Sequence, residues 1–234
     1  MQVVILCGGK GTRLRELTED IPKPLVEIGG KPILWHIMKI YSHHGFNDFI
    51  LCLGYKGSKI EDYFKKHKND WSITFVDTGE NSLKSQRLMQ IKEYIKGDTF
   101  LCAYGDDVCD VDIKKIIEFH KKNKKIATLT AIPLYSQFGI VEIDKNGAVG
   151  SFKEKPRLND YWFNGGYFVF DKKIFDYLDK GELEKEVFEF LASQKQIQAY
   201  RHEGFWKSMN TFKDTIELNQ IWDKGQAPWQ IWQD

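Results

Sequence analysis

The sequence predicts an α/β fold in which a mostly parallel central sheet is flanked by helices and carries a small extra lobe. In the first 135 residues, short apolar runs alternate with longer amphipathic segments, the pattern of strands that alternate with helices. The chain has 234 residues, of which 42% are hydrophobic and 29% charged. Such a chain suits one soluble globular domain with a substantial core and is too short for two ordinary domains.

Strands in the first half are predicted where apolar runs end at glycine or at polar residues. We expect them at 3–6, 48–53, 72–76, 99–104 and 126–132. Helices are predicted where apolar residues recur with helical spacing, at 32–44, 59–68, 83–95 and 112–121. The first of these helices should end at Gly45. Because strands and helices alternate, the strands should run parallel, with helices covering both faces of the sheet.

The second half of the chain has a different pattern. Asn146-Gly147 separates apolar runs at 140–143 and 149–154, which is a strong signal for a β-hairpin. Further strands are predicted at 163–170 and 197–201, and further helices at 184–193 and 212–223. No low-complexity linker divides the two halves, so we expect a lobe fused onto the sheet. The tail 227–232 contains two tryptophans, which suit either self-association or packing on the same chain.

The most informative segment is a glycine-rich loop, Leu6-Cys7-Gly8-Gly9-Lys10-Gly11-Thr12-Arg13, which includes the end of the first strand. Three glycines in four positions let backbone N–H groups face a ligand without Cβ atoms in the way, which suits phosphate oxygens. Arg13 can bind a phosphate through two hydrogen bonds. Lys23, held between two prolines, supplies a point charge. The segment therefore predicts a triphosphate site.

Two familiar glycine motifs do not fit this loop. The P-loop pattern G-x-x-x-x-G-K-[ST] occurs nowhere in the chain. The dinucleotide pattern G-x-G-x-x-G would need glycine at position 14, where the chain has Leu14. A turn that needs glycine only for its backbone angles would explain the glycines, but it would not explain Arg13 and Lys23.

Composition argues against several classes of function. The net charge of +1 gives no reason to expect a nucleic acid partner, and the basic run 121–125 is most simply the solvated end of a helix. No apolar segment approaches the roughly 20 residues of a membrane span. The chain begins directly with a strand, so we expect no signal peptide. The four cysteines form no C-x-x-C pair and suit a reducing cytoplasm.

A second candidate site residue is Asp106, which follows the strand 99–104 in the turn Gly105-Asp106. Ligands of open α/β sheets bind beyond the carboxyl ends of the strands, so this turn and the glycine loop should lie at the same edge. A carboxylate beside a triphosphate is repulsive unless a divalent cation lies between them, and Mg²⁺ prefers carboxylates, phosphate oxygens and water. Asp106 as a plain turn residue is the alternative.

The order of these motifs resembles that of the sugar nucleotidyltransferase family over nearly the whole chain. The shared motifs are L-x-G-G-x-G-T-R, P-K-P, a strand ending in G-D, then E-K-P and N-G-G. The segments 28–38, 54–57 and 202–206 are most similar to its glucose-1-phosphate cytidylyltransferase branch. The resemblance implies a Rossmann-like sheet of the nucleotidyltransferase type with a small acceptor-binding lobe. It implies one domain, 1–234, with a nucleotide-binding half at 1–135 and an acceptor-binding half with the C-terminal helix and tail at 136–234.

The resemblance also implies a reaction and roles for particular residues. The reaction is the Mg²⁺-dependent transfer of CMP from CTP to a small phosphorylated acceptor, with release of pyrophosphate. By resemblance, the catalytic residues are Arg13, Lys23 and Asp106. The nucleotide-binding residues are Leu6, Gly8, Gly9, Gly11, Thr12, Arg13, Lys23, Thr78 and Gly79. The acceptor-binding residues are Arg87, Glu154, Lys155 and Asn164, and the metal ligands are Asp106 and Asn210.

Three departures from the family pattern concern the same region. The chain has Met209-Asn210-Thr211 in place of M-D-T, so an amide replaces the second metal-binding carboxylate. It has Lys84-Ser85-Gln86-Arg87 in place of T-G-G-R. The segment G-D-G-V-A-D becomes G-D-D-V-C-D at 105–110.

Two explanations of these departures remain open. The acceptor can be glucose 1-phosphate, as in the most similar branch, or L-glutamine phosphate, which would give CDP-L-glutamine for capsule phosphoramidate. Alternatively, the protein is a catalytically weak, nucleotide-binding regulatory homologue. Retention of Arg13, Lys23 and Asp106 favours an active enzyme. We expect no nucleic acid or membrane partner, and self-association stays open.

Overall fold

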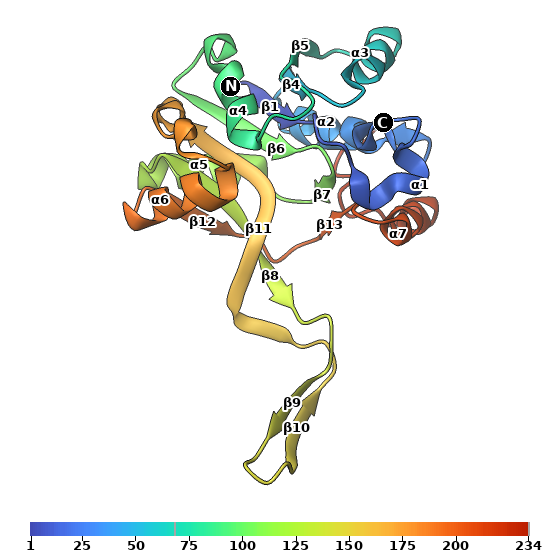
Figure 1. Cartoon of the computed structure of the whole chain (residues 1–234). Helices are drawn as coiled ribbons and strands as arrows, with labels where there is room; N and C mark the ends of the chain where they lie inside the picture. Colours follow the sequence, from blue (N-terminus) through green and yellow to red (C-terminus); the bar gives the residue numbers. More distant parts are fainter. Residues whose placement is uncertain (68, 234) are drawn as a thin grey trace.

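A mixed sheet of seven strands forms the centre of the molecule, in the order β12-β8-β11-β6-β1-β4-β5 (Figure 1). This computed structural model describes residues 1–67 and 69–233, without the side chains of Arg15 and Glu16. The strands are β1 Val3–Leu6, β4 Asp48–Leu53, β5 Ser72–Asp77, β6 Thr99–Tyr104, β8 Ala127–Tyr135, β11 Arg157–Asp171 and β12 Ile197–Arg201. All neighbouring pairs are parallel except those of β11, which runs antiparallel to β6 and β8. The predicted mostly parallel sheet is confirmed.

Alternate residues of β1 face two separate apolar cores, one on each side of the sheet. Val3 and Ile5 belong to the first core, which contains α2. Val4 and Leu6 belong to the second, which contains Leu88 of α4. Since both faces of β1 are buried, its sequence is apolar throughout and does not alternate. The helices are α1 Arg15–Thr18, α2 Ile33–His43, α3 Gly57–Lys66, α4 Lys84–Gln90, α5 Ile113–Asn123, α6 Phe188–Ser193 and α7 Phe212–Asp223.

Most predicted elements agree with the structure to within a few residues, but two helices differ, and the predicted strand 163–170 begins six residues earlier, at Arg157. The predicted helix 83–95 ends at Gln90 and continues as a separate 3₁₀ turn, Lys92–Tyr94, because the N–H of Tyr94 bonds to the carbonyl of Ile91, three residues back. The predicted helix 184–193 begins with a π-helical turn, Leu183–Val187. The predicted helix 59–68 begins at Gly57, and its last residue lies outside the described residues.

Three short strand pairs complete the fold. Strands β2 Glu27–Ile28 and β3 Lys31–Pro32 pair with each other, as do β7 Asp107–Cys109 and β13 Trp206–Ser208. Residues 27–31 and 107–109 lay between the predicted elements, and such short pairs leave little signal in the sequence. The third pair is the predicted hairpin, β9 Ile140–Ile143 and β10 Val149–Lys153. It forms an arm that extends away from the main sheet (Figure 1).

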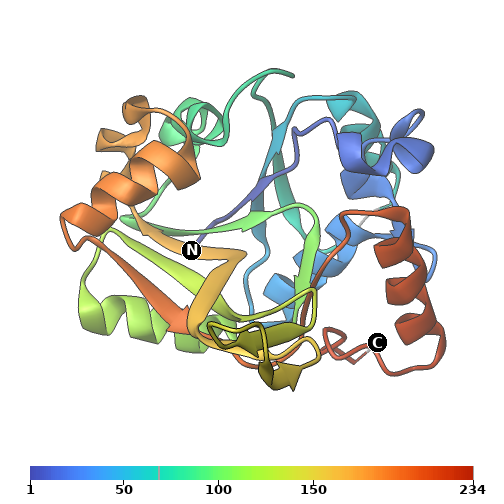
Figure 2. The same ribbon diagram turned by 60° about the horizontal axis from the view of Figure 1, so that its bottom comes forward.

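The tryptophan tail packs on its own chain. Trp229 is completely buried and Trp232 nearly so. The ring of Trp229 stacks against Phe205 and lies close to Trp222 of α7. Figure 2 shows the C-terminus beside α7, on the side of the molecule away from α5 and α6. Within the described residues, no helix is long and apolar enough to cross a membrane.

His36 links α2 to this tail. Its Nε2 lies 2.8 Å from the carbonyl oxygen of Ile28, and its Nδ1 lies 3.4 Å from Nε1 of Trp229, which donates to it. The imidazole is completely buried, and burial lowers its pKa to about 4. The neutral ring therefore uses one nitrogen as donor and the other as acceptor.

We expect this buried histidine to make the fold sensitive to acid. An unfolded chain protonates His36 near pH 6.5, whereas the folded chain does so only near pH 4, so stability falls as pH decreases between these values. The full loss is about 3 kcal/mol. Urea unfolding of wild type and His36→Gln at pH 7 and pH 4.5 measures it, and the variant should lose less stability than wild type. His67→Gln, which changes an exposed histidine, should behave as wild type; equal pH dependence in all three proteins would refute the assignment.

Candidate active site

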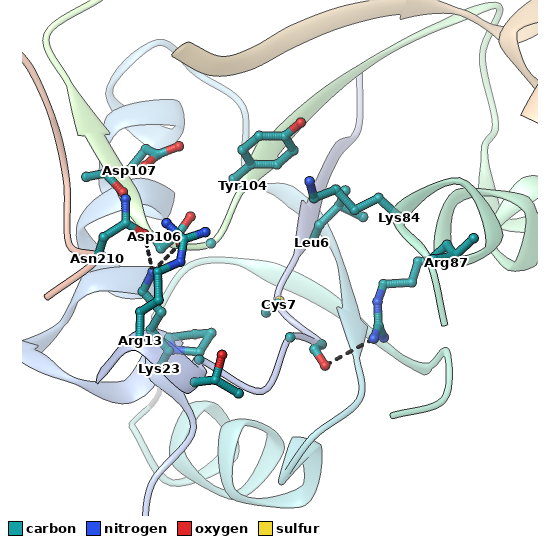
Figure 3. A pocket seen from close by; sticks show the side chains of 18 of the residues that line it. Leu6, Cys7, Arg13, Lys23, Lys84, Arg87, Tyr104, Asp106, Asp107 and Asn210 are labelled. Atoms are coloured by element: carbon teal, nitrogen blue, oxygen red, sulfur yellow. Dashed lines mark hydrogen bonds and ion pairs between the residues drawn. The ribbon is translucent and has the colours of Figure 1, made fainter. Parts of the chain in front are cut away.

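A cavity of about 510 Å³ opens where β1 and β6 end. The two strands are parallel neighbours, with Leu6 opposite Tyr104. The glycine loop and the turn Gly105-Asp106 therefore leave the sheet side by side, as the sequence predicted. Figure 3 shows the side chains that surround the cavity.

Two glycines of the loop are constrained, Gly8 by the guanidinium of Arg87 and Gly11 by its own backbone conformation. A Cβ on Gly8 would lie 2.0 Å from Nη1 of Arg87, and Gly11 has a φ of +62°. A Cβ on Gly9, in contrast, would meet no protein atom within 4 Å. The backbone at Gly9 is thus open to a ligand, which is what a phosphate cradle needs.

Lys23, Asp106 and Asn210 point toward one another at one end of the cavity (Figure 3). Nζ of Lys23 lies 2.5 Å from Oδ2 of Asp106 and donates to Oδ1 of Asn210 at 3.0 Å. Each side chain comes from a different segment: a 3₁₀ turn after Pro22, the turn after β6, and the residues before α7. The exposed Arg13 lines the same cavity beside them. The three predicted catalytic residues are therefore brought together.

The donor atoms at this end of the cavity suit a divalent cation. Asp106 supplies a carboxylate and Asn210 an amide oxygen, and both oxygens contact the same cationic group, Nζ of Lys23. These are hard oxygen ligands of the kind that Mg²⁺ prefers, in a number that leaves room for phosphate oxygens and water. Asp106 and Asn210 thus fit the metal that the family resemblance implies.

Asp107 lines the same cavity and was not among the predicted site residues. Burial raises the pKa of its carboxyl well above the usual range, and the charge of Asp106 adds to this effect. A Cβ on Gly166 would lie 2.5 Å from Oδ2 of Asp107, so this glycine makes room for the carboxylate. The sequence signal was the second aspartate of G-D-D, which we noted as a departure without assigning it a role.

The opposite end of the cavity contains a polar network that the sequence did not reveal. Glu184, on the π-helical turn, accepts hydrogen bonds from Tyr104 and Lys84. Burial opposes ionisation of Glu184, but these bonds outweigh it and lower its pKa. Nδ2 of Asn164 donates to the hydroxyl of Tyr104 at 3.2 Å. Lys84, Tyr104 and Asn164 line the cavity, so this end offers charged and neutral hydrogen-bonding groups to a ligand.

Arg87 lies with the loops predicted to bind the nucleotide. Its guanidinium donates to four backbone carbonyls and to the hydroxyl of Thr78. One of these carbonyls belongs to Gly8 and another to Gly79, so Arg87 ties the glycine loop to the segment 78–80. The side chain is 4% exposed, and these contacts occupy both of its terminal nitrogens.

The cavity unites most of the predicted residues and leaves four outside. Those that line it are Leu6, Gly8, Gly9, Gly11, Thr12, Arg13, Lys23, Arg87, Asp106, Asn164 and Asn210. Thr78 is completely buried below the cavity, donating to the carbonyl of Leu53 at 2.6 Å, and Gly79 follows it. Glu154 and Lys155 are exposed residues that follow β10 at the foot of the arm.

Comparison with known proteins identifies the relatives of this chain. The family described as "Nucleotidyl transferase" matches residues 2–225. Glucose-1-phosphate cytidylyltransferase of Salmonella typhimurium is 45% identical, and the match covers all of both chains. Mannose-1-phosphate guanyltransferase of Candida albicans is 31% identical over 92% of this chain and 63% of its own. The crystal structure of HddC from Yersinia pseudotuberculosis complexed with GMP-PN aligns with a TM-score of 0.72 and 28% identity, covering 94% of this chain and 99% of that one.

Proposed function

Since this chain belongs to the nucleotidyl transferase family, we propose that it transfers CMP from CTP to a small phosphorylated acceptor and releases pyrophosphate. The observation that carries the proposal is the cavity that joins the glycine loop, Lys23 and Asp106. The choice of CTP is supported by the 45% identity to a cytidylyltransferase, against 31% to a guanyltransferase.

In the proposed reaction, the acceptor's phosphate attacks the α-phosphorus of CTP. A phosphate monoester has a second pKa of about 6, so it is largely dianionic at neutral pH and needs no general base. A bond forms between an acceptor oxygen and the α-phosphorus, and the bond from this phosphorus to the bridging oxygen of the β-phosphate breaks. Lys23 stabilises the negative charge at the α-phosphate, and Arg13 binds the departing pyrophosphate.

The glycine loop and the segment near Thr78 and Gly79 hold the nucleotide in this proposal. Backbone N–H groups at Gly9 and Gly11 face the phosphates, and the backbone near Leu6 and Thr78 contacts the cytosine. Arg87 acts as a positioning residue because it ties these two segments together through Gly8 and Gly79. We therefore propose that Arg87 supports binding of the nucleotide, and not of the acceptor as the family resemblance implied.

Asp106 and Asn210 would hold Mg²⁺. When bound there, the ion would neutralise phosphate oxygens and favour the departure of pyrophosphate. The protein's contribution is to hold Oδ2 of Asp106 and Oδ1 of Asn210 directed at one point, next to Lys23.

Glucose 1-phosphate is the acceptor that we propose first, because the 45% identical relative is a glucose-1-phosphate cytidylyltransferase. L-Glutamine phosphate is the second candidate. The observation that favours it is the charge of Lys84, which lines the cavity and pairs with Glu184 behind it, because a hexose presents only neutral hydroxyls to such a group. Asn164 lies within reach of either acceptor, and Glu154 and Lys155 would need to approach the cavity by a movement of the arm.

Three further parts of the proposal concern the whole chain. Residues 1–234 act as one domain, with the nucleotide held by 1–135 and the acceptor by 136–234. A weak regulatory homologue is not favoured, since Arg13, Lys23 and Asp106 line one cavity. A cytoplasmic location suits a CTP-dependent enzyme with four buried free cysteines.

Competition between the two acceptors tests the acceptor assignment. Wild type is supplied with CTP, Mg²⁺ and equal amounts of glucose 1-phosphate and L-glutamine phosphate, and products are identified by mass spectrometry. We expect CDP-glucose to dominate. If CDP-L-glutamine dominates instead, the acceptor is L-glutamine phosphate. The absence of any CDP-linked product would refute the proposed reaction.

A further inference from the structure

Three side chains that can bind a metal ion meet outside the cavity of the active site. Cys109, Asp110 and His202 each offer one ligand atom, and these atoms all lie within 4.8 Å of one another. Cys109 is the last residue of β7, Asp110 follows it, and His202 follows β12. None of the three lines the cavity. Cys109 is also a departure from the family motif G-D-G-V-A-D, which has alanine at this position, and the proposed reaction gives it no role.

One buried oxygen of this cluster accepts no hydrogen bond from the described part of the chain. It is Oδ1 of Asp110. Nε2 of His202 lies only 2.9 Å away, but its direction does not suit a hydrogen bond to this oxygen, and it contacts the carbonyl oxygen of Phe205 at 3.3 Å. A buried carboxylate oxygen without a donor is costly, and a bound cation would remove this cost.

The backbone brings the carboxylate and the imidazole together. A Cβ on Gly204 would lie 2.5 Å from Oδ1 of Asp110 and 2.6 Å from Cε1 of His202, so the glycine leaves the room that both groups occupy. The backbone N–H of Asp110 donates to the carbonyl of Phe205 at 3.2 Å. The segment after β12 is therefore held against the end of β7.

We propose that Cys109, Asp110 and His202 bind Zn²⁺, which fastens the end of β7 to the segment after β12. Sulfur, imidazole and carboxylate ligands together are typical of zinc, whereas Mg²⁺ prefers oxygen ligands alone. On binding, the thiol of Cys109 releases its proton to solvent and its sulfur bonds to the ion. The thiolate and the carboxylate then balance the two positive charges of the ion.

The geometry of the cluster is close to that of a tetrahedral site. Zinc bonds of about 2.0–2.3 Å place the ligand atoms of such a site roughly 3.3–3.6 Å apart, so small movements of these side chains complete it. The side chains of Asp110 and His202 are 28% and 12% exposed, which leaves the fourth position open to water. Burial raises the pKa of the Cys109 thiol, while the backbone N–H groups of Asp110 and Val111 favour the thiolate that the metal requires.

The ion would stabilise the strand pair that holds both proposed Mg²⁺ ligands. Strand β7 pairs with β13, and the N–H of Met209 donates to the carbonyl of Asp106 at 2.9 Å. Asp106 directly precedes β7, and Asn210 lies two residues after β13. The Zn²⁺ site is thus a structural site, separate from the position where Asp106 and Asn210 meet.

The four buried cysteines offer a matched pair of substitutions. Cys109→Ala removes the sulfur ligand and introduces the residue of the family motif, so the variant should fold, which its thermal unfolding verifies. Cys102→Ala makes the same change at another completely buried cysteine, on β6. His202→Ala removes the imidazole and leaves the sulfur in place, as a second variant of the site.

Titration with Co²⁺ as the probe, after treatment with a chelator and in excess Mg²⁺, tests the proposal. A bond between Co²⁺ and a thiolate gives a charge-transfer absorption in the near ultraviolet, which the oxygen ligands Asp106 and Asn210 cannot produce. We expect this absorption to saturate at one Co²⁺ for each chain in wild type and in Cys102→Ala, and Zn²⁺ to abolish it. It should be absent in Cys109→Ala, and His202→Ala should bind Co²⁺ about a hundredfold more weakly.

Two results would overturn the proposal. One is wild type without the thiolate absorption, in which case His202 and Asp110 form only an ion pair. The other is an absorption in Cys109→Ala equal to that of wild type. Neither result depends on the reaction in the cavity, because neither CTP nor an acceptor is present.

Discussion

Lys23→Ala should lower kcat for pyrophosphate release by about a thousandfold. Removing one preorganised protein group that stabilises the charge of a transition state typically has an effect of this size. Lys23 is the cation at the end of the cavity where Asp106 and Asn210 meet, and its side chain is only 11% exposed. Its charge is held in place before substrates bind, so the loss should appear mainly in kcat. Steady-state pyrophosphate release with CTP and glucose 1-phosphate measures it.

Lys31→Ala is the matched control for this prediction. Lys31 also precedes a proline, but it is exposed and lies over the ring of Trp35, away from the cavity. Its removal should leave kcat within about twofold of wild type, since exposed charges outside a site contribute little. A nearly normal kcat in Lys23→Ala, or an equal loss in Lys31→Ala, would contradict the role of Lys23.

Asp106→Asn should lower kcat by at least about a hundredfold and raise the Mg²⁺ concentration needed for half-maximal rate. The substitution keeps the size of the side chain and removes the only negative charge among the two proposed metal ligands. It also removes the ion pair with Lys23. Rates across a Mg²⁺ titration measure both effects. Metal binding is measured separately from the loss of the free Mn²⁺ signal in electron paramagnetic resonance, in the presence of CTP.

Asn210→Asp makes the converse change at the other proposed ligand. A carboxylate there restores the family's M-D-T motif and adds a charge where the amide oxygen now accepts from Lys23. The metal should then bind about tenfold more tightly, in both the rate titration and the Mn²⁺ measurement. An unchanged metal affinity in Asn210→Asp would show that residue 210 is not a ligand.

The centre of the site could be predicted because local patterns determine it. An apolar strand, a glycine loop and a Gly-Asp turn each leave a clear signal, and parallel neighbouring strands must bring the loop and the turn to the same edge. Lys23 and Arg13 were recognisable as extra charges that a structural turn does not need. The structure places all of these side chains around one cavity.

Features that depend on distant contacts could not be predicted in the same way. Arg87 was assigned to the acceptor by motif, but its direction depends on where the carbonyls of Gly8 and Gly79 lie. The partnership of Tyr104 with Glu184 joins residues that are 80 positions apart. The arm was predicted as a hairpin, but only the structure shows that its apolar side chains Val141, Ile143, Val149 and Phe152 are exposed.

In the proposed function, CTP is cleaved in this cavity between its α- and β-phosphates, and CMP is transferred to a phosphorylated acceptor. The most direct measurement is pyrophosphate release by wild type with CTP and Mg²⁺, with and without glucose 1-phosphate or L-glutamine phosphate, alongside Lys23→Ala. We predict acceptor-dependent release of one pyrophosphate for each CDP-linked product, almost abolished in the variant. If CTP raises the thermal stability of wild type but neither acceptor elicits pyrophosphate, the cavity binds a nucleotide without transferring it, and the proposed function is wrong.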